Sequence, residues 1–277
     1  MGDTSVKKNT GAGLRGQSAG ETKICTVGAE GNSLRYRGYD VVELAEQSTF
    51  YEVAYLLLRG ELPTQGELEK FKIKIKGLRT LPDKLIEVLE RIPADAHPMD
   101  VLRTGTSVLG NLEQEGDFSN QMGVTDRLLA TLPGMVVYWY RYSHEGVRID
   151  TDTDEDGIGA HFLHLLRGES PSELEARVMD VSLILYAEHE FNASTFTARV
   201  CASTLSDLHS CITGAIGSLR GPLHGGANEA AMDMIEQYGS VDEAIDDVMA
   251  KLTAKELIMG FGHAVYRLRD PRNAIIK

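Results

Sequence analysis

Between residues 41 and 219 apolar side chains recur at spacings of three and four, and short polar breaks interrupt them. This is the period of one face of an α-helix. Gly60, Pro63, Pro82 and Pro93 stand in the breaks, where helices stop. Many helices joined by short loops indicate an all-α fold. The pattern predicts helices over residues 41–46, 51–58, 67–78, 84–91, 99–112, 126–142, 158–166, 173–189, 194–208 and 209–219.

The N-terminal part of the chain lacks this period. Residues 1–24 combine glycines with scattered Lys and Arg and contain no apolar stretch of the kind a secretory signal needs. We therefore expect a flexible N-terminus on a cytoplasmic protein. Residues 26–40 carry three glycines around the run LRYR, which predicts a short hairpin or a turn-rich segment.

The charge balance limits the partners of the chain. With 28 Lys and Arg against 41 Asp and Glu, the formal net charge is −13, which repels polyanions and argues against nucleic acid. Nothing in the sequence approaches the apolar run of about 20 residues that crosses a bilayer, so we expect no membrane partner. Small anions stay possible ligands, because a few converging Arg and His side chains decide such a site locally.

Several residues of metal-binding type have simpler explanations. The three cysteines show no CxxC spacing, which argues against a disulfide framework and a cysteine zinc site. The acidic run 150–156 mimics the start of a calcium loop, but Leu163 stands where the bidentate Glu belongs. It is expected to be a solvated loop and helix N-terminus. His161 and His164 lie three apart on a predicted helix, yet the dense spacings of a metal-dependent hydrolase are absent, so we expect packing roles and no metal.

Other histidines stand at expected helix ends, where a cation or a capping donor is welcome. These are His97, His144 and His209, and we interpret all three as structural. At the end of the sequence, Asp270 and Pro271 form a strong helix start. Only six residues follow, fewer than a usual helix of about 11, and we expect the natural polypeptide to continue.

His224 has an unusual local sequence. It lies in the run GPLHGGAN, where two glycines allow close backbone approach to a ligand and a helix is expected to begin. The positive end of a helix dipole disfavours imidazolium, so His224 is predicted to be neutral and able to donate a hydrogen bond to a developing oxyanion. The alternative is a glycine-rich turn that holds a histidine by chance.

Two further segments have the composition of a site. Residues 258–266 place two glycines and an aromatic residue directly before His263, and Arg267, Arg269 and Arg272 follow closely. Such clustering in an acidic protein suggests recognition of carboxylates or phosphates. The third segment, 186–195, breaks the helical pattern with a polar cluster that contains His189.

Five motifs in this order and spacing resemble the citrate synthase family, over nearly the whole chain from about Cys25. The region around Tyr138–His144 and residues 186–195 looks more like the bacterial 2-methylcitrate synthases of that family than like its long hexameric members. The motifs are residues 34–39 (LRYRGY), 97–99 (HPM), the His189 segment, 221–228 (GPLHGGAN) and 260–272 (GFGHAV through DPR).

The resemblance implies an acyltransferase that condenses the enol of an acyl-CoA with the ketone of oxaloacetate and then hydrolyses the thioester. By motif match, His224 is the donor to the enol oxygen and His263 the donor to the ketone, while His189 and Arg272 bind the carboxylates of oxaloacetate. Residues Leu257, Ile258, Met259, Gly260 and Phe261 match the strip along which CoA lies. Acyl-CoA is then a co-substrate, with no permanently bound cofactor. The base of the family is an aspartate beyond the second histidine, in a part that this sequence does not contain.

The resemblance also implies a domain layout. It predicts a flexible N-terminus over 1–24, a large helical domain over 25–223 and the incomplete beginning of a smaller helical domain over 224–277, in a homodimer. Propionyl-CoA is the expected substrate, which would connect the enzyme to propionate metabolism. Two alternatives stay open: a citrate synthase that uses acetyl-CoA in the tricarboxylic acid cycle, and an inactive fragment that acts only in oligomerisation or binding.

Overall fold

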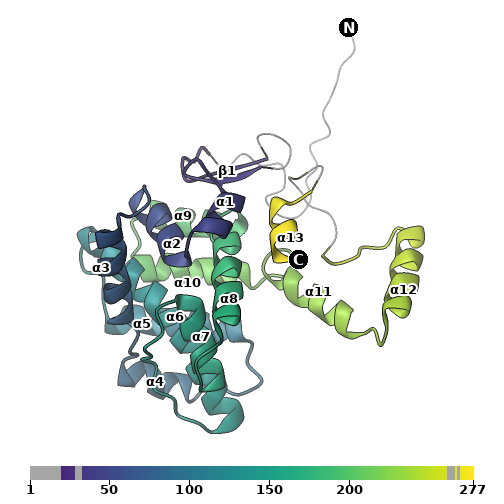
Figure 1. Ribbon diagram of the computed structural model, residues 1–277. Coiled ribbons are helices and arrows are strands. Elements are labelled where there is room, and N and C mark those ends of the chain that lie inside the picture. Colours follow the sequence, from purple (N-terminus) through teal and green to yellow (C-terminus); the bar gives the residue numbers. More distant parts are fainter. Residues whose placement is uncertain (1–19, 29–32, 261–265, 267–268) are drawn as a thin grey trace.

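The computed structural model of the protein describes residues 20–28, 33–260, 266 and 269–277. Helices dominate these residues, and the all-α prediction is confirmed (Figure 1). The helices are α1 (Val41–Gln47), α2 (Phe50–Arg59), α3 (Gln65–Lys76), α4 (Asp83–Leu89), α5 (Pro98–Leu112), the 3-10 helix η1 (Phe118–Asn120), α6 (Gln121–Glu145), α7 (Ile158–Arg167), α8 (Glu173–Tyr186), α9 (Ala193–Ser203), α10 (Leu208–Leu219), α11 (Gly226–Glu236), α12 (Val241–Ala254) and α13 (Pro271–Ile276). None of them, within the part described, combines the length and the apolar character needed to cross a bilayer.

Local sequence fixes where several helices begin. Three of them start with a capping box, in which a Ser or Thr hydroxyl accepts the backbone N–H three residues later and a Glu accepts the N–H of the cap in return. The pairs are Thr49 with Glu52, Thr64 with Glu67 and Ser172 with Glu175. Each box satisfies two donors that a helix start would otherwise leave unpaired.

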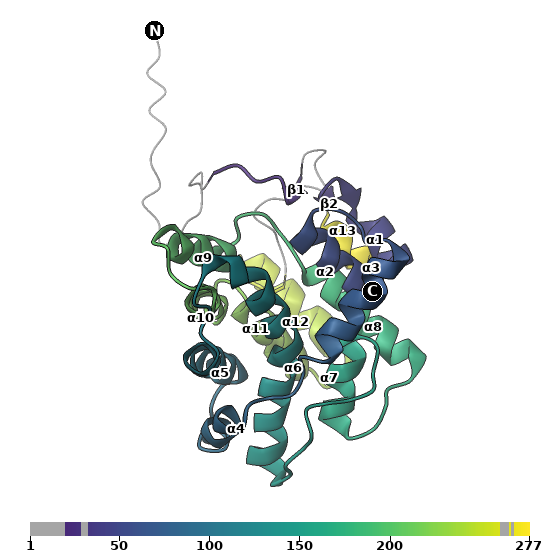
Figure 2. The ribbon, with the colours of Figure 1, turned by 90° about the vertical axis from the view of Figure 1, so that its left-hand side faces the viewer.

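The longest helix, α6, lies at the centre of the main body, between α5 and α7 (Figure 2). Its buried face carries Met135 and Trp139, which pack with leucines of α4 and α5. The indole N–H of Trp139 donates to the carbonyl of Ile92 at 3.3 Å, so the one polar group of this large side chain keeps a partner inside the core.

The sequence placed the start of α6 at Asp126, and this was wrong by five residues because the helix begins at Gln121. Aspartate usually favours helix ends. Here the fully buried Asp126 carboxylate accepts from Arg59 at 2.8 Å and from Lys74 at 2.6 Å. Two cations from other helices thus stabilise an aspartate inside α6.

The predicted hairpin segment forms a small antiparallel sheet of β1 (Cys25–Val27), β2 (Leu34–Tyr36) and β3 (Tyr39–Asp40). Cys25, Leu34 and Tyr36 are buried against α1, α2 and α8. The Tyr36 hydroxyl donates to the carbonyl of Ile184 at 3.0 Å, near the end of α8. The sheet therefore covers the C-terminal end of α8.

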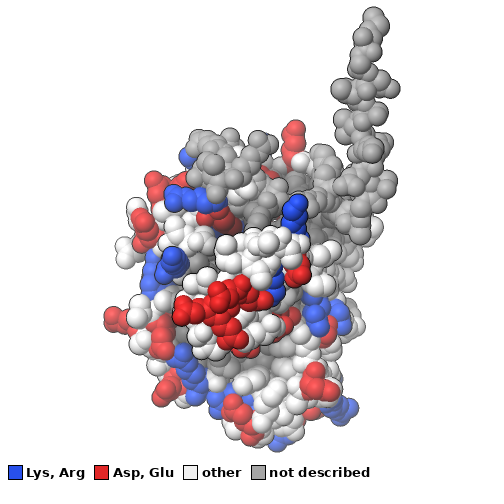
Figure 3. Space-filling view, turned by 90° about the vertical axis from the view of Figure 1, so that its right-hand side faces the viewer, with Lys and Arg blue, Asp and Glu red and all other residues white. Residues whose placement is uncertain are grey.

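The last helices differ in how they pack. Figure 1 shows α11 and α12 extending away from the main body, and neither contains a buried residue. The first seven residues of α12 include four carboxylates, and Figure 3 shows a group of Asp and Glu side chains in the middle of the side of the molecule on which α12 lies. By contrast, α13 packs against α1 and α8, and its Ile275 joins their apolar cluster.

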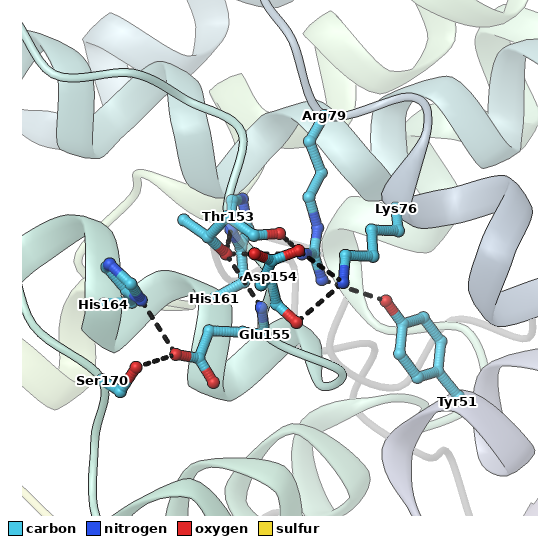
Figure 4. Close-up of polar contacts among 9 residues, drawn as sticks. All are labelled: Tyr51, Lys76, Arg79, Thr153, Asp154, Glu155, His161, His164 and Ser170. Carbon is cyan, nitrogen blue, oxygen red and sulfur yellow. Dashed lines mark hydrogen bonds and ion pairs between the residues drawn. The ribbon is translucent and has the colours of Figure 1, made fainter.

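A polar cluster connects the end of α3 to the loop before α7 (Figure 4). The buried Arg79 guanidinium donates to the carbonyl of Thr153 at 2.9 Å, and the Thr153 hydroxyl lies 3.0 Å from Nδ1 of His161. His164 contacts the Glu155 carboxylate at 2.8 Å. The two histidines therefore have separate packing and ion-pair contacts, and no group of three or more metal-binding side chains occurs among the residues described.

Acid should destabilise the protein through His161. Burial, aided by the positive Arg79, lowers the pKa of His161 from 6.5 to about 3. Between these values the unfolded chain binds a proton that the folded protein does not, so the free energy of unfolding falls as the pH falls from 6.5 toward 3. We expect His161 to account for a loss of about 2 kcal/mol between pH 7 and pH 5.

Urea unfolding at both pH values measures this term. The His161→Gln variant should lose correspondingly less stability between pH 7 and pH 5 than the wild type, whereas His144→Gln, at an exposed position, should follow the wild type. An equal pH dependence in wild type and His161→Gln would contradict the prediction.

Candidate functional site

His224 lies in a tight turn directly before α11. Its backbone N–H donates to the carbonyl of Gly221 at 2.9 Å. The turn requires a glycine at position 225, since a Cβ there would stand 2.5 Å from the carbonyl oxygen of Leu219. The glycines next to His224 thus allow the chain to bend sharply. The bend places the histidine at the start of a helix.

The ring of His224 faces the start of α9. Its Nε2 lies 3.3 Å from the backbone N–H of Ser194 and 3.0 Å from the Ser194 hydroxyl. A backbone N–H can only donate, so this contact favours the tautomer in which Nε2 accepts and Nδ1 carries the proton. Burial of the ring lowers the pKa of His224, which favours this neutral form.

Asn192 continues the contact behind Ser194. Its Oδ1 accepts the N–H of Thr195 at 3.0 Å and caps α9. The same oxygen lies 2.7 Å from the Ser194 hydroxyl. The Ser194 hydroxyl donates its one proton to this oxygen. The sequence marks this segment as a polar cluster, but no pattern in it predicts a role for Ser194 or Asn192.

His189 lies in the segment between α8 and α9. The sequence predicted a helix up to His189, but α8 ends at Tyr186, and the chain turns sharply after it. Nε2 of His189 lies 3.0 Å from the hydroxyl of Tyr266, and the two rings meet edge to face. Tyr266 is buried, and the sequence offered only its place after the second glycine-rich motif as a sign of a role.

Arg272 already has an anionic partner. Asp270 caps α13 by accepting the N–H of Arg272, and the guanidinium of Arg272 donates to both oxygens of the same carboxylate, at 2.9 and 2.6 Å. Tyr266 lies close to both side chains, because the negative charge of Asp270 raises its pKa and the positive charge of Arg272 lowers it. Arg272 therefore belongs to the neighbourhood of His189 and Tyr266, although in this structure its charge is balanced by Asp270.

The proposed CoA strip is described only in part. Leu257 is exposed, Ile258 is buried and Met259 is half-buried. Gly260 has a φ of 84°, which suits glycine. Phe261 and His263 lie outside the described residues. Among the residues described, the structure therefore forms two groups, His224 with Ser194 and His189 with Tyr266, joined by the short segment 189–194.

Two histidines that were interpreted as structural have further features. His97 caps α5 by accepting the N–H of Met99, and its Nε2 lies 2.5 Å from the Glu229 carboxylate of α11. His209 is not an accessible helix-end cation, as its position suggested, because its ring is buried in α10. Among the described residues no hydrogen-bond partner meets either of its ring nitrogens.

Comparison with known proteins gives consistent matches. The family model "Citrate synthase, C-terminal domain" matches residues 13–277. A 2-methylcitrate synthase of Shewanella oneidensis is 70% identical over 274 residues, which are 99% of this chain and 73% of that protein.

Solved structures agree with this match. The citrate synthase of Thermotoga maritima superposes with a TM-score of 0.82 at 41% identity, over 95% of this chain and 70% of that chain. The citrate synthase of Thermoplasma acidophilum, solved as a ternary complex with carboxymethyl coenzyme A and oxaloacetate, gives a TM-score of 0.84 at 30% identity over the same shares.

Proposed function

Because this chain belongs to the citrate synthase family of acyltransferases that form a carbon–carbon bond, we propose that it condenses propionyl-CoA with oxaloacetate and water to give 2-methylcitrate and CoA. The observation that carries this choice is the 70% identity to a 2-methylcitrate synthase, against 41% to the citrate synthase of Thermotoga maritima. The use of acetyl-CoA to make citrate is the less supported alternative.

His224 is the donor to the thioester oxygen in this proposal. As the α-proton of the acyl group leaves, negative charge develops on that oxygen, and a preorganised donor stabilises it. The contact of Nε2 with the Ser194 N–H supports the assignment, because it leaves the proton on Nδ1, the other edge of the ring. A neutral imidazole can act as this donor through its N–H and does not have to be protonated first.

Oxaloacetate is held by His189 and Arg272 in the same proposal, and His263 donates to its ketone. Charge-assisted bonds from Arg and His suit two carboxylates. The contact between His189 and Tyr266, with Arg272 nearby, supports a shared anion site. Leu257, Ile258, Met259, Gly260 and Phe261 line the CoA strip. Carboxymethyl coenzyme A and oxaloacetate are the ligands of the Thermoplasma complex.

The proposed layout has a large helical domain over 25–223 and a smaller one that begins at His224 and closes over the substrates. The separation of α11 and α12 from the main body supports this boundary. The pair His97 and Glu229 bridges it at 2.5 Å. Closure would exclude water during condensation, which protects the enol.

We further propose a cytoplasmic homodimer without a permanently bound metal or cofactor, serving propionate metabolism. Val200 and Leu205 expose half or more of their surface on and just after α9. Neither ring nitrogen of the buried His209 nor Oε1 of Glu115 has a hydrogen-bond partner among the described residues, although Nδ1 of His209 lies 4.0 Å from the Asp207 carboxylate. A second copy packed against α9 would bury Val200 and Leu205.

Leu205→Asp should therefore convert the dimer to a monomer, as measured by sedimentation.

Substrate choice is tested by measuring CoA thiol release with oxaloacetate and each acyl-CoA, using the enzyme expressed from its complete reading frame. A difference of one methyl group is worth about 1 to 3 kcal/mol in an apolar pocket, or roughly 10 to 200-fold in kcat/KM. We expect propionyl-CoA to be preferred by such a factor. A preference for acetyl-CoA would favour the alternative function.

Replacing Ser194 by alanine should lower kcat by about tenfold, because the hydroxyl helps to fix the ring of His224. The decrease in kcat should be smaller than that caused by replacing His224, since the backbone N–H of residue 194 still favours the same tautomer of the His224 ring. Ser182→Ala, which removes an exposed hydroxyl bonded only within α8, is the matched control. Equal kcat values for Ser194→Ala and Ser182→Ala would contradict the prediction.

A further inference from the structure

The turn that carries His189 has an unfavourable backbone conformation. Glu190 has a φ of 54°, in the left-handed region that residues with a Cβ adopt at a cost. Such a residue keeps this conformation only where its surroundings hold it there. The contacts of Glu190 therefore show what fixes the orientation of the adjacent His189.

Two hydrogen bonds hold Glu190 in place. Its own N–H donates to the carboxylate of Glu188 at 2.7 Å, which closes a small loop around His189. Its carboxylate accepts the N–H of Val27 at 2.9 Å. Val27 ends β1, a strand that β2 pins to the main body.

The surroundings of the turn reinforce these bonds. Burial raises the pKa of the Glu188 carboxyl and raises that of the neighbouring Cys25 thiol to about 12, and the two side chains are hydrogen-bonded. On the other side, Asn192 caps α9. The turn is thus fixed at both ends, between the N-terminal sheet and the helix that carries Ser194.

We propose that Glu190 is a positioning residue for oxaloacetate: its bond to β1 holds the left-handed turn that orients His189 toward the substrate. This inference rests on the proposed function, in which His189 binds a carboxylate of oxaloacetate. Glu190 itself does not contact the substrate. Its effect passes through the direction of the His189 ring, which meets Tyr266 at 3.0 Å.

The test uses Glu190→Gly in the enzyme from the complete reading frame. Glycine accepts a φ of 54° without strain, so the variant can keep the fold while it loses the carboxylate. We expect the KM for oxaloacetate to rise about tenfold, the worth of a hydrogen bond to a charged group, with the KM for acyl-CoA unchanged. Glu190→Gln keeps an acceptor oxygen and should restore the KM to within about threefold of wild type.

Asp180→Ala is the matched control, because Asp180 also accepts a backbone N–H from the N-terminal part of the chain, that of Phe50, at 2.9 Å. This variant should lose stability without a change in either KM. A double-mutant cycle then isolates the coupling. If Glu190 acts through His189, Glu190→Gly should have no effect on the oxaloacetate KM in a His189→Ala background.

The outcomes separate the two claims. A wild-type KM in Glu190→Gly, or an effect that persists unchanged in the His189→Ala background, would overturn the inference and leave the proposed function intact. An unchanged oxaloacetate KM in His189→Ala itself would instead remove the substrate-binding role of His189, and the inference with it.

Discussion

Replacing His224 by alanine should lower kcat for condensation by about a thousandfold, the upper end of what a single oxyanion donor contributes. In wild type, Nε2 of His224 accepts from Ser194 and leaves the Nδ1 N–H as the donor. The variant has no imidazole and therefore no such donor. The KM values should change much less, because the lost contact strengthens only as charge develops on the thioester oxygen. Thiol release at saturating substrates measures the effect.

His144→Ala is the control for this experiment, since His144 is exposed at the end of α6, where it is hydrogen-bonded to Ser143 and Tyr140 and its ring meets those of Trp139 and Tyr140. It should keep wild-type kcat. Circular dichroism establishes that both variants are folded. A folded His224→Ala enzyme with more than a tenth of the wild-type kcat would rule out the proposed donor role.

Replacing Asp126 by alanine should reduce the free energy of unfolding by about 2 to 3 kcal/mol, because the partly buried Arg59 guanidinium loses its charged partner, whereas the half-exposed Lys74 can turn to solvent. The carboxylate is fully buried and bonded to both Arg59 and Lys74. Nη1 of Arg59 is already buried without a hydrogen-bond partner among the described residues. Without Asp126, Nη2 of the same guanidinium would also lose its hydrogen bonds. Urea unfolding monitored by circular dichroism gives the value.

Asp95→Ala removes an aspartate from an exposed loop and should change stability by less than about 0.5 kcal/mol. Asp126→Asn keeps the shape and one acceptor oxygen, and should fall between the two. If Asp126→Ala is as stable as Asp95→Ala, the two cations do not depend on this carboxylate, and the explanation for an aspartate inside α6 fails.

The helices could be predicted from sequence because their signals are local. Apolar spacing located α2, α5 and α7 within one or two residues. Three errors lie where the local pattern was incomplete. Arg59 and Lys74 bind Asp126 inside α6, and the N-terminal sheet and the turn at Glu190 meet the end of α8. The helix predicted over 194–208 was also wrong, because α9 ends at Ser203. The spacing of apolar residues along one helix contains no information on contacts with distant segments.

The candidate site shows the same division. Glycine-rich turns marked His224, because such turns have a local sequence signature. Ser194 and Tyr266 have no signature of their own, and they matter because the fold brings them within 3.0 Å of a histidine 30 or 77 residues away. The carboxylate that holds Arg272 was predicted only as a helix cap.

The bond between Val27 and Glu190 also has a consequence for how the protein is made. Its two residues are 163 positions apart, so the N-terminal strand emerges from the ribosome long before the turn it holds. The closing of so long a loop carries an entropic cost that grows with its length. The amide proton of Val27 should therefore gain protection from solvent exchange late in folding, and its exchange rate reports when the turn around His189 has formed.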